Sequence, residues 1–113
     1  MSDDTTYFAV WARDLPGRLE DRRRVREAHR TRLREGVPGV RVVLGGPTLD
    51  DAGDMAGSLL VIEAADIEQV RAFVAGDPYM AAGVYDPASV QILPWAWGIG
   101  RPSRRSSTSP LEA

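Results

Sequence analysis

Residues 5–13 read TTYFAVWAR, a run rich in aromatic and β-branched residues that predicts a strand. Because side chains alternate between the two faces of a strand, Phe8 and Val10 share one face. Tyr7 and Trp11 fall on the other face. Both faces are then largely apolar, which is typical of a central strand covered on two sides. The rest of the fold is therefore expected to build outward from this strand.

Six further elements are expected after it. In chain order they are a helix, two strands, a second helix, a short helical turn and a last strand, at residues 18–35, 37–44, 58–64, 66–75, 78–82 and 89–97. Gly45-Gly46-Pro47 is expected to end the second strand, and the acidic residues 48–57 to form a loop to the third. The order βαββαβ predicts an α+β, ferredoxin-like sandwich, with a four-stranded antiparallel sheet and helices on one face.

The first helix combines a narrow apolar stripe with many arginines. The stripe is expected to consist of Leu19, Val25, Ala28, His29 and Leu33. We interpret the arginines as a solvated face; they are Arg22, Arg23, Arg24, Arg26, Arg30, Arg32 and Arg34. Gly36 is a suitable residue to close the helix.

The chain has 113 residues, 43% of them hydrophobic, which is enough for one small domain. We expect residues 1–4 to be a frayed N-terminus, 5–100 to be the folded domain, and 101–113 to be a disordered polar tail. One face of the predicted sheet would be left open, with Tyr7 and Trp11 on it. A large exposed apolar patch usually marks an interface, so we expect a homodimer whose sheets pack together.

Composition excludes several classes of function. The net charge of −2 gives no reason to expect a nucleic-acid or membrane partner, and no apolar run approaches the ~20 residues of a membrane span. There is no cysteine and only one histidine, which argues against metal centres built on those ligands. All 14 basic residues are arginine, so Schiff-base chemistry on lysine is excluded. The acidic N-terminus lacks signal-peptide features, and the expected compartment is the cytoplasm.

His29 is the first candidate for chemistry, because histidine readily takes and gives protons near neutral pH. The alternative is a histidine buried in the core with a satisfied hydrogen bond. Asp77 is the second candidate, as the partner that would orient the imidazole in general acid–base catalysis. Its alternative role is to cap the helical turn that begins at Pro78. The two roles of Asp77 are compatible, since a capping carboxylate keeps a free oxygen.

Two further residues are candidate ligand contacts, and two motifs are set aside. Arg26 lies one turn before His29 and could bind a carboxylate or phenolate with its planar guanidinium. Ser58 could hydrogen-bond a ligand from a strand end. Gly45-Gly46-Pro47 lacks the remainder of a nucleotide-binding fingerprint, so no cofactor is expected there. The aspartates of residues 50–54 lack the pattern of a calcium loop, so no metal is expected.

Taken in order, several short motifs resemble the YciI-like (YCII-related) family over about residues 6–97. They are YFAVWARD, Pro16-Gly17, Arg26-x-x-His29-x-x-x-Leu33, Gly45-Gly46-Pro47, Gly57-Ser58-Leu59 and Asp77-Pro78-Tyr79-x-x-x-Gly83-Val84-Tyr85. The resemblance implies a dimeric α+β barrel and a site built on His29 and Asp77. Some members are similar to a dehydrochlorinase that acts on a chlorinated hydroxyhydroquinone.

The resulting hypothesis is a cofactor-independent enzyme that transfers protons on an oxygenated small molecule, aromatic or polyketide-like, as a lyase, isomerase or cyclase. His29 and Asp77 would be catalytic, and Arg26, Ser58, Tyr79 and Trp11 would contact the substrate. The alternative is a module without catalytic activity that binds a small molecule or serves as an accessory interaction platform.

Overall fold

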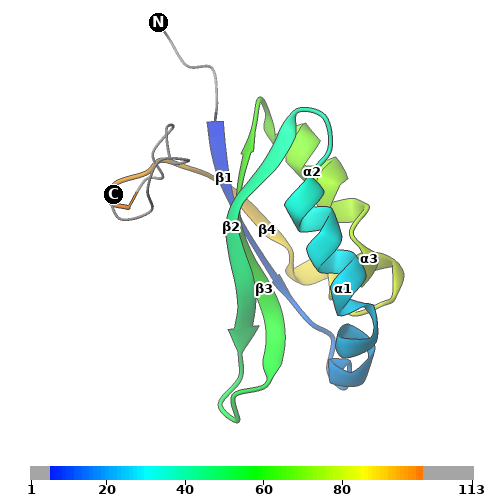
Figure 1. The fold of residues 1–113 in the computed structure, drawn as a ribbon. Helices are drawn as coiled ribbons and strands as arrows, with labels where there is room; N and C mark the ends of the chain where they lie inside the picture. The colour runs from blue at the N-terminus through cyan, green and yellow to red at the C-terminus, as the bar shows by residue number, and fades with distance from the viewer. Residues whose placement is uncertain (1–5, 101–113) are drawn as a thin grey trace, which may run out of the picture.

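The computed structural model describes residues 6–100, which form a four-stranded antiparallel sheet with its helices on one side (Figure 1). Its elements are β1 (Thr6–Arg13), α1 (Leu19–Glu35), β2 (Val40–Leu49), β3 (Met55–Ala64), α2 (Ile67–Ala75), α3 (Pro78–Ala81), the 3₁₀ turn η1 (Pro87–Ser89) and β4 (Gln91–Trp95). Across the sheet the strand order is β2-β3-β1-β4. The predicted ferredoxin-like α+β fold is confirmed. The predictions for residues 1–4 and 101–113 fall outside the described part of the chain.

Strand β1 lies in the middle of the sheet, as its two apolar faces predicted. It pairs with β3 on one side and with β4 on the other. Phe8 and Val10 are buried on the face that the helices cover, and they pack in one core cluster with Ile62 and Phe73. Burial of this cluster, which includes Phe73 of α2, contributes to holding the sheet and α2 together.

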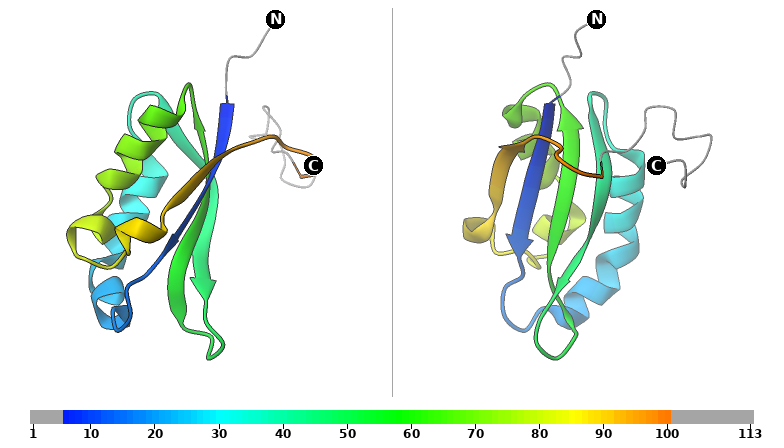
Figure 2. Two further views of the ribbon diagram at one scale, coloured as in Figure 1. Left: turned by 180° about the vertical axis from the view of Figure 1, so that it is seen from behind. Right: turned by 90° about the vertical axis from the view of Figure 1, so that its left-hand side faces the viewer.

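The opposite face of the sheet is left open by the helices (Figure 2). Trp11 is paired in register with Leu59, and Trp95 lies on the neighbouring strand β4. These three side chains are exposed by 39%, 47% and 39% respectively. The expectation that a second copy covers this face stays a prediction.

Helix α1 ends at Glu35, and Gly36 follows with a φ of 65°, in the left-handed region that glycine adopts without strain. The predicted apolar stripe needs a correction, because Ala28 is exposed. It lies about 100° around the helix from His29, outside the contact with the sheet. The two buried residues of α1 are His29 and, two turns earlier, Arg22. The interpretation of Arg22 as part of a solvated face is wrong.

Strands β2 and β3 form a longer hairpin than predicted. Strand β2 continues through Gly45-Gly46-Pro47 to Leu49, and β3 begins at Met55 rather than at residue 58. The reason is that β2 is an edge strand, where glycine and proline are tolerated because one side of the backbone needs no ladder partner. The acidic segment is therefore a tight turn, closed by hydrogen bonds between Asp50 and Asp54.

The two predicted N-caps are confirmed. Asp66 accepts a hydrogen bond from the Gln69 N–H at the start of α2, and Asp77 accepts one from the Tyr79 N–H at the start of α3. Strand β4 lies at the other edge of the sheet and carries Pro94, as expected for an edge strand. The short α3 turn that Asp77 begins packs against α1, which brings this cap to the histidine.

Candidate active site

His29 and Asp77 are 48 positions apart in sequence and form a buried side-chain pair. Nδ1 of His29 lies 2.8 Å from Oδ1 and 2.9 Å from Oδ2 of Asp77. The neutral imidazole therefore donates its Nδ1–H to the carboxylate and keeps a lone pair on Nε2. Nε2 has no hydrogen-bond partner within residues 6–100. The arrangement is that of a base with its orienting carboxylate.

The carboxylate of Asp77 does two things at once. Oδ1 also accepts the Tyr79 N–H at 2.8 Å, so the N-cap bond and the histidine bond share one oxygen. The φ and ψ of Asp77 are extended, and Pro78 follows at the first helical position, which fixes the cap geometry. The direction of the carboxylate toward His29 is thus set by local backbone structure.

Two tyrosines enclose the imidazole. The ring of Tyr79 stacks on it with centroids 3.9 Å apart and an interplanar angle of 17°. Tyr85 meets it edge-on at 6.4 Å. Burial raises the pKa of both phenols, and in Tyr85 the nearby Asp77 charge raises the pKa further. The rings therefore stay neutral and hold the imidazole plane in position.

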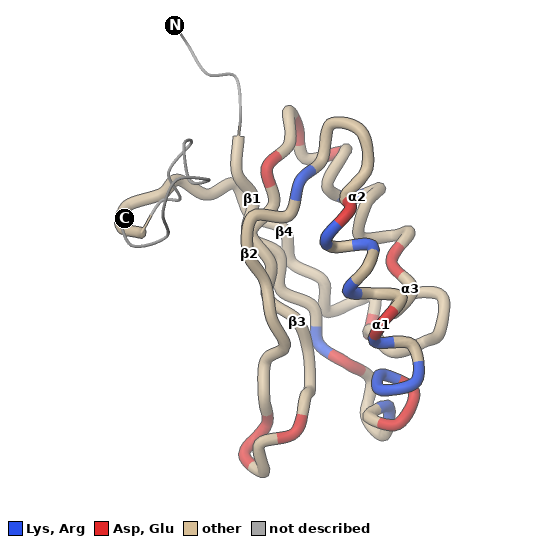
Figure 3. Tube along the Cα trace, viewed as in Figure 1, with Lys and Arg blue, Asp and Glu red and all other residues tan. Residues whose placement is uncertain are grey.

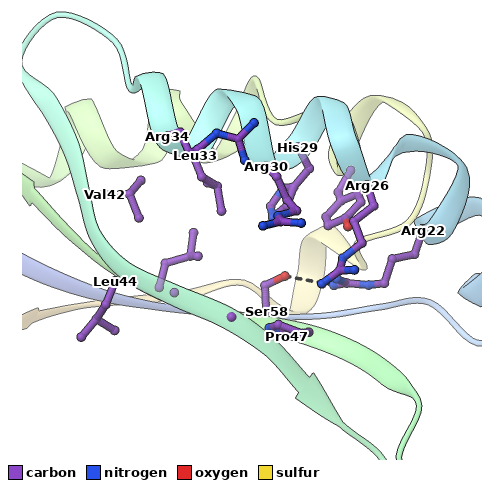
Figure 4. Close-up of a pocket in the computed structure, with 14 residues that line it drawn as sticks. Arg22, Arg26, His29, Arg30, Leu33, Arg34, Val42, Leu44, Pro47 and Ser58 are labelled. Carbon is purple, nitrogen blue, oxygen red and sulfur yellow. Dashed lines mark hydrogen bonds between the residues drawn. The ribbon is translucent and has the colours of Figure 1, made fainter.

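A cavity of about 390 Å³ lies between α1 and the β2–β3 hairpin, with His29 in its wall. Figure 4 shows arginines of α1 on one side and Ser58 and Pro47 on the strands opposite. Arg26, Ser58 and Tyr79, three of the four predicted substrate contacts, line this cavity. The fourth, Trp11, does not. The alternation of β1 places it on the open face, next to Leu59, so it is not positioned to contact a molecule bound beside His29.

Arg22 is the residue of the site that sequence reasoning missed. Its side chain is 2% exposed and forms a two-point salt bridge with Asp14, with Nε–Oδ2 at 2.7 Å and Nη2–Oδ1 at 3.0 Å. Nη2 also donates to the Ser58 hydroxyl at 3.0 Å, and the guanidinium lies 4.4 Å from the Tyr79 ring centroid. Burial alone would lower the pKa of Arg22, but the hydrogen bond and charge of Asp14 outweigh burial and raise it. Arg22 is a permanent cation that holds Ser58 at the cavity wall.

A family model for the YCII-related domain matches residues 6–96, which is almost all of the described chain. The chain belongs to the YCII-related domain family. It is 34% identical to Protein YciI of Escherichia coli over 90 residues, covering 74% of this chain and 92% of that protein. It is also 33% identical to an uncharacterized protein of Haemophilus influenzae over 95 residues, with 79% and 95% of the two chains covered.

Two solved structures are similar to this YCII-related domain. One is TftG of Burkholderia phenoliruptrix, a 5-chloro-2-hydroxyhydroquinone dehydrochlorinase in complex with 2,5-dihydroxybenzoquinone. It is 33% identical, with a TM-score of 0.67, and the match covers 81% of this chain and 95% of that one. The other is a candidate antibiotic biosynthesis monooxygenase of Bacteroides thetaiotaomicron, 16% identical, with a TM-score of 0.50 and coverage of 84% and 90%. The second shows the shared fold alone.

Residues 6–100 of this YCII-related domain hold no cluster of three or more His, Cys, Asp or Glu side chains that could bind a metal ion. No helix in the same range is long and apolar enough to cross a membrane.

The two enclosed tyrosines predict how the YCII-related domain responds to alkali. Because the pKa of each phenol is higher in the folded chain than its ordinary value of 10.0, the unfolded chain releases these protons first as pH rises. Their contribution to stability is therefore complete below pH 10 and is lost as pH passes through the folded-state pKa. We expect the free energy of unfolding to fall above pH 10 by up to about 1.4 kcal/mol per pH unit for each tyrosine. Urea titrations at several pH values check this.

Tyr79→Phe and Tyr85→Phe are the matched controls for this experiment. Each removes one ionisable group and keeps the ring, so each should make the alkaline loss of stability less steep. An identical slope in the parent and in both variants would contradict the assignment.

Proposed function

We propose that the protein is a cofactor-independent enzyme that transfers protons on a small hydroxylated ring, with His29 as the base and Asp77 as its orienting partner. The observation that carries the proposal is the buried His29–Asp77 hydrogen bond beside a cavity, with Nε2 of His29 unpartnered among the described residues. An unpartnered ring nitrogen beside a cavity is available to take a proton from a bound molecule. General acid–base help of this kind contributes about 10²–10⁴ in rate.

The likeness to TftG supports elimination of HCl as the reaction. TftG acts as a dehydrochlorinase on 5-chloro-2-hydroxyhydroquinone, and this chain matches it at 33% identity. Loss of HCl from that compound leaves a hydroxybenzoquinone. One hydroxyl proton moves to the chlorinated ring carbon, a second hydroxyl proton goes to the base, and chloride leaves with the electron pair of the C–Cl bond, so no external oxidant is needed. In the proposal His29 accepts the second proton, and a histidine can also return a proton to carbon.

The other groups at the cavity have supporting roles in the proposal. Arg26 would stabilise the negative oxygen that forms when a ring hydroxyl loses its proton. The Tyr79 hydroxyl is buried and has no hydrogen-bond partner in the described residues, so it can donate to a bound oxygen. Ser58, held by Arg22, would contact the ring from the strand side. None of these steps requires a cofactor.

The direct test follows chloride release from 5-chloro-2-hydroxyhydroquinone, together with its conversion to the hydroxyquinone, in the parent and in His29→Asn. We expect release by the parent to exceed the spontaneous rate and to fall by about 10²-fold or more in the variant. Equal rates in the two proteins would remove His29 from the chemistry. Saturable binding by the parent without chloride release would favour the alternative, a binding module without catalytic activity.

A further inference from the structure

The helix side of the cavity is a wall of arginines. Four of them line it at intervals of one turn: Arg22, Arg26, Arg30 and Arg34. Residues four apart lie on one face of a helix, and like charges at this spacing destabilise the helix. In Figure 3 the blue that marks arginine recurs along α1, whereas the middle of the facing strands β2 and β3 has neither blue nor red. This repulsion recurs at each turn and lowers the stability of the helix, which indicates that the arginines serve a function.

Only two of the four arginines are neutralised within the described chain. Arg22 is paired with Asp14, and Arg34 lies 3.2 Å from a carboxylate oxygen of Glu27. Arg26 and Arg30 have neither an ion pair nor a hydrogen bond in residues 6–100, although both line the cavity. Two adjacent cations beside the base are thus left without a counter-ion from the described part of the protein.

None of the acidic side chains in residues 6–100 lines the cavity. The carboxylate beside it, Asp77, is already bound to His29 and to the Tyr79 N–H. Apart from the Ser58 hydroxyl, the opposite wall is apolar or bare backbone, with Gly45, Gly46 and Pro47 on β2 and Leu60 on β3. Positive charge on one side and a low-dielectric wall on the other concentrate anions in the space between them.

We infer that the substrate is a flat organic anion, in which a ring carries a carboxylate or an ionised enol oxygen that Arg26 and Arg30 bind. The inference rests on the proposed function, because it places the anionic edge of the ring at the arginines while His29 takes the proton. The flat face of the ring packs against strand β2 beside Leu60, whose side chain fills the space where Gly45 has no Cβ. The planar, multi-donor guanidinium suits both kinds of anionic oxygen.

Binding measurements test the inference without any turnover. The probes are 2,5-dihydroxybenzoate for the carboxylate, 2,5-dihydroxybenzoquinone for the ionised enol, hydroquinone as the neutral ring, and inorganic phosphate as an anion without a ring. Calorimetry is done on the parent and on His29→Asn. We expect at least one ring anion to bind about tenfold or more tightly than hydroquinone and than phosphate. The absence of cysteine and lysine removes the side chains that most readily add to a quinone.

Substitution separates the two arginines from the general charge of the helix. Arg26→Gln and Arg30→Gln should each weaken binding of the ring anion by roughly threefold to tenfold and leave hydroquinone unchanged. Arg23→Gln is the matched control, since Arg23 is an exposed arginine of the same helix that does not line the cavity. Its affinity should equal that of the parent. Circular dichroism checks that every variant is folded.

Each outcome decides the matter. The inference would be overturned by equal affinity for the neutral ring and the anions, or by an equal loss of affinity in all three arginine variants. It would also be overturned by tight binding of phosphate, or by no binding of any probe at millimolar concentration. These results are distinct from failure of the proposed function. A His29→Asn variant that binds the anion normally while chloride release stays at the parent rate would overturn the catalytic role and leave the anion preference standing.

Discussion

Asp77→Asn is expected to lower the rate of chloride release by about 10²–10⁴-fold without unfolding the protein. Asparagine is as good an N-cap as aspartate, so its one carbonyl oxygen continues to accept the Tyr79 N–H. The amide NH₂ group then faces Nδ1 of His29. The imidazole responds by moving its proton to Nε2, and the base is lost from the side that faces the cavity.

The measurement combines kinetics with spectroscopy. His29 is the only histidine, so ¹⁵N chemical shifts of its ring report the tautomer without ambiguity. The Asp77→Asn spectrum should show the proton on Nε2, where the parent carries it on Nδ1. Asp66→Asn is the matched control, because Asp66 caps α2 in the same way and has no histidine partner. A parent-like rate in Asp77→Asn would remove the carboxylate from the mechanism.

The second large effect is on stability. Arg22→Met is expected to lower the free energy of unfolding by about 3–5 kcal/mol, since it leaves the buried Asp14 carboxylate without its partner. The substitution should also weaken binding of the ring anion, because Ser58 loses the donor that holds its hydroxyl. Urea unfolding gives the magnitude, with ring-anion affinity as a second readout.

The double variant Arg22→Met/Asp14→Leu separates the charge from the packing. With both partners apolar no unpaired ion remains, and most of the lost stability should return. Arg71→Met is the exposed comparison. Arg71 forms a surface ion pair with Glu68, and its loss should cost less than about 1 kcal/mol. Equal costs for Arg22→Met and Arg71→Met would contradict a structural role for the buried pair.

The local elements around the site could be predicted because their signals are local. A capping aspartate followed by proline marks the start of α3 at Asp77, and the three- and four-residue spacing of α1 sets His29 toward the sheet. Local signals do not say that these two residues meet, since the contact spans 48 positions. That expectation came from the resemblance of the whole set of motifs to a family.

Arg22 could not be distinguished from its neighbours by composition. It is one of seven arginines predicted on a solvated face. Its burial depends on Asp14, which follows the end of β1 and is separated from α1 by a turn. The four- and three-residue spacing of Arg22, Arg26 and His29 was visible, but the charge of Arg22 made its burial an unfavourable expectation. The β2 boundary was missed for a related reason. Gly45-Gly46-Pro47 interrupts a central strand but not an edge strand, and the position of β2 in the sheet is a property of the tertiary fold.

The shared oxygen of Asp77 couples the chemistry to the opening and closing of the backbone. The Tyr79 amide proton can exchange with solvent only when its bond to Oδ1 breaks, and that event also frees the carboxylate from its fixed direction toward His29. Hydrogen–deuterium exchange at this one amide therefore reports how frequently the cap that fixes the direction of the Asp77 carboxylate opens in the resting protein. A ligand that settles beside His29 should slow that exchange, which makes the Tyr79 amide a reporter of occupancy even for compounds that are never turned over.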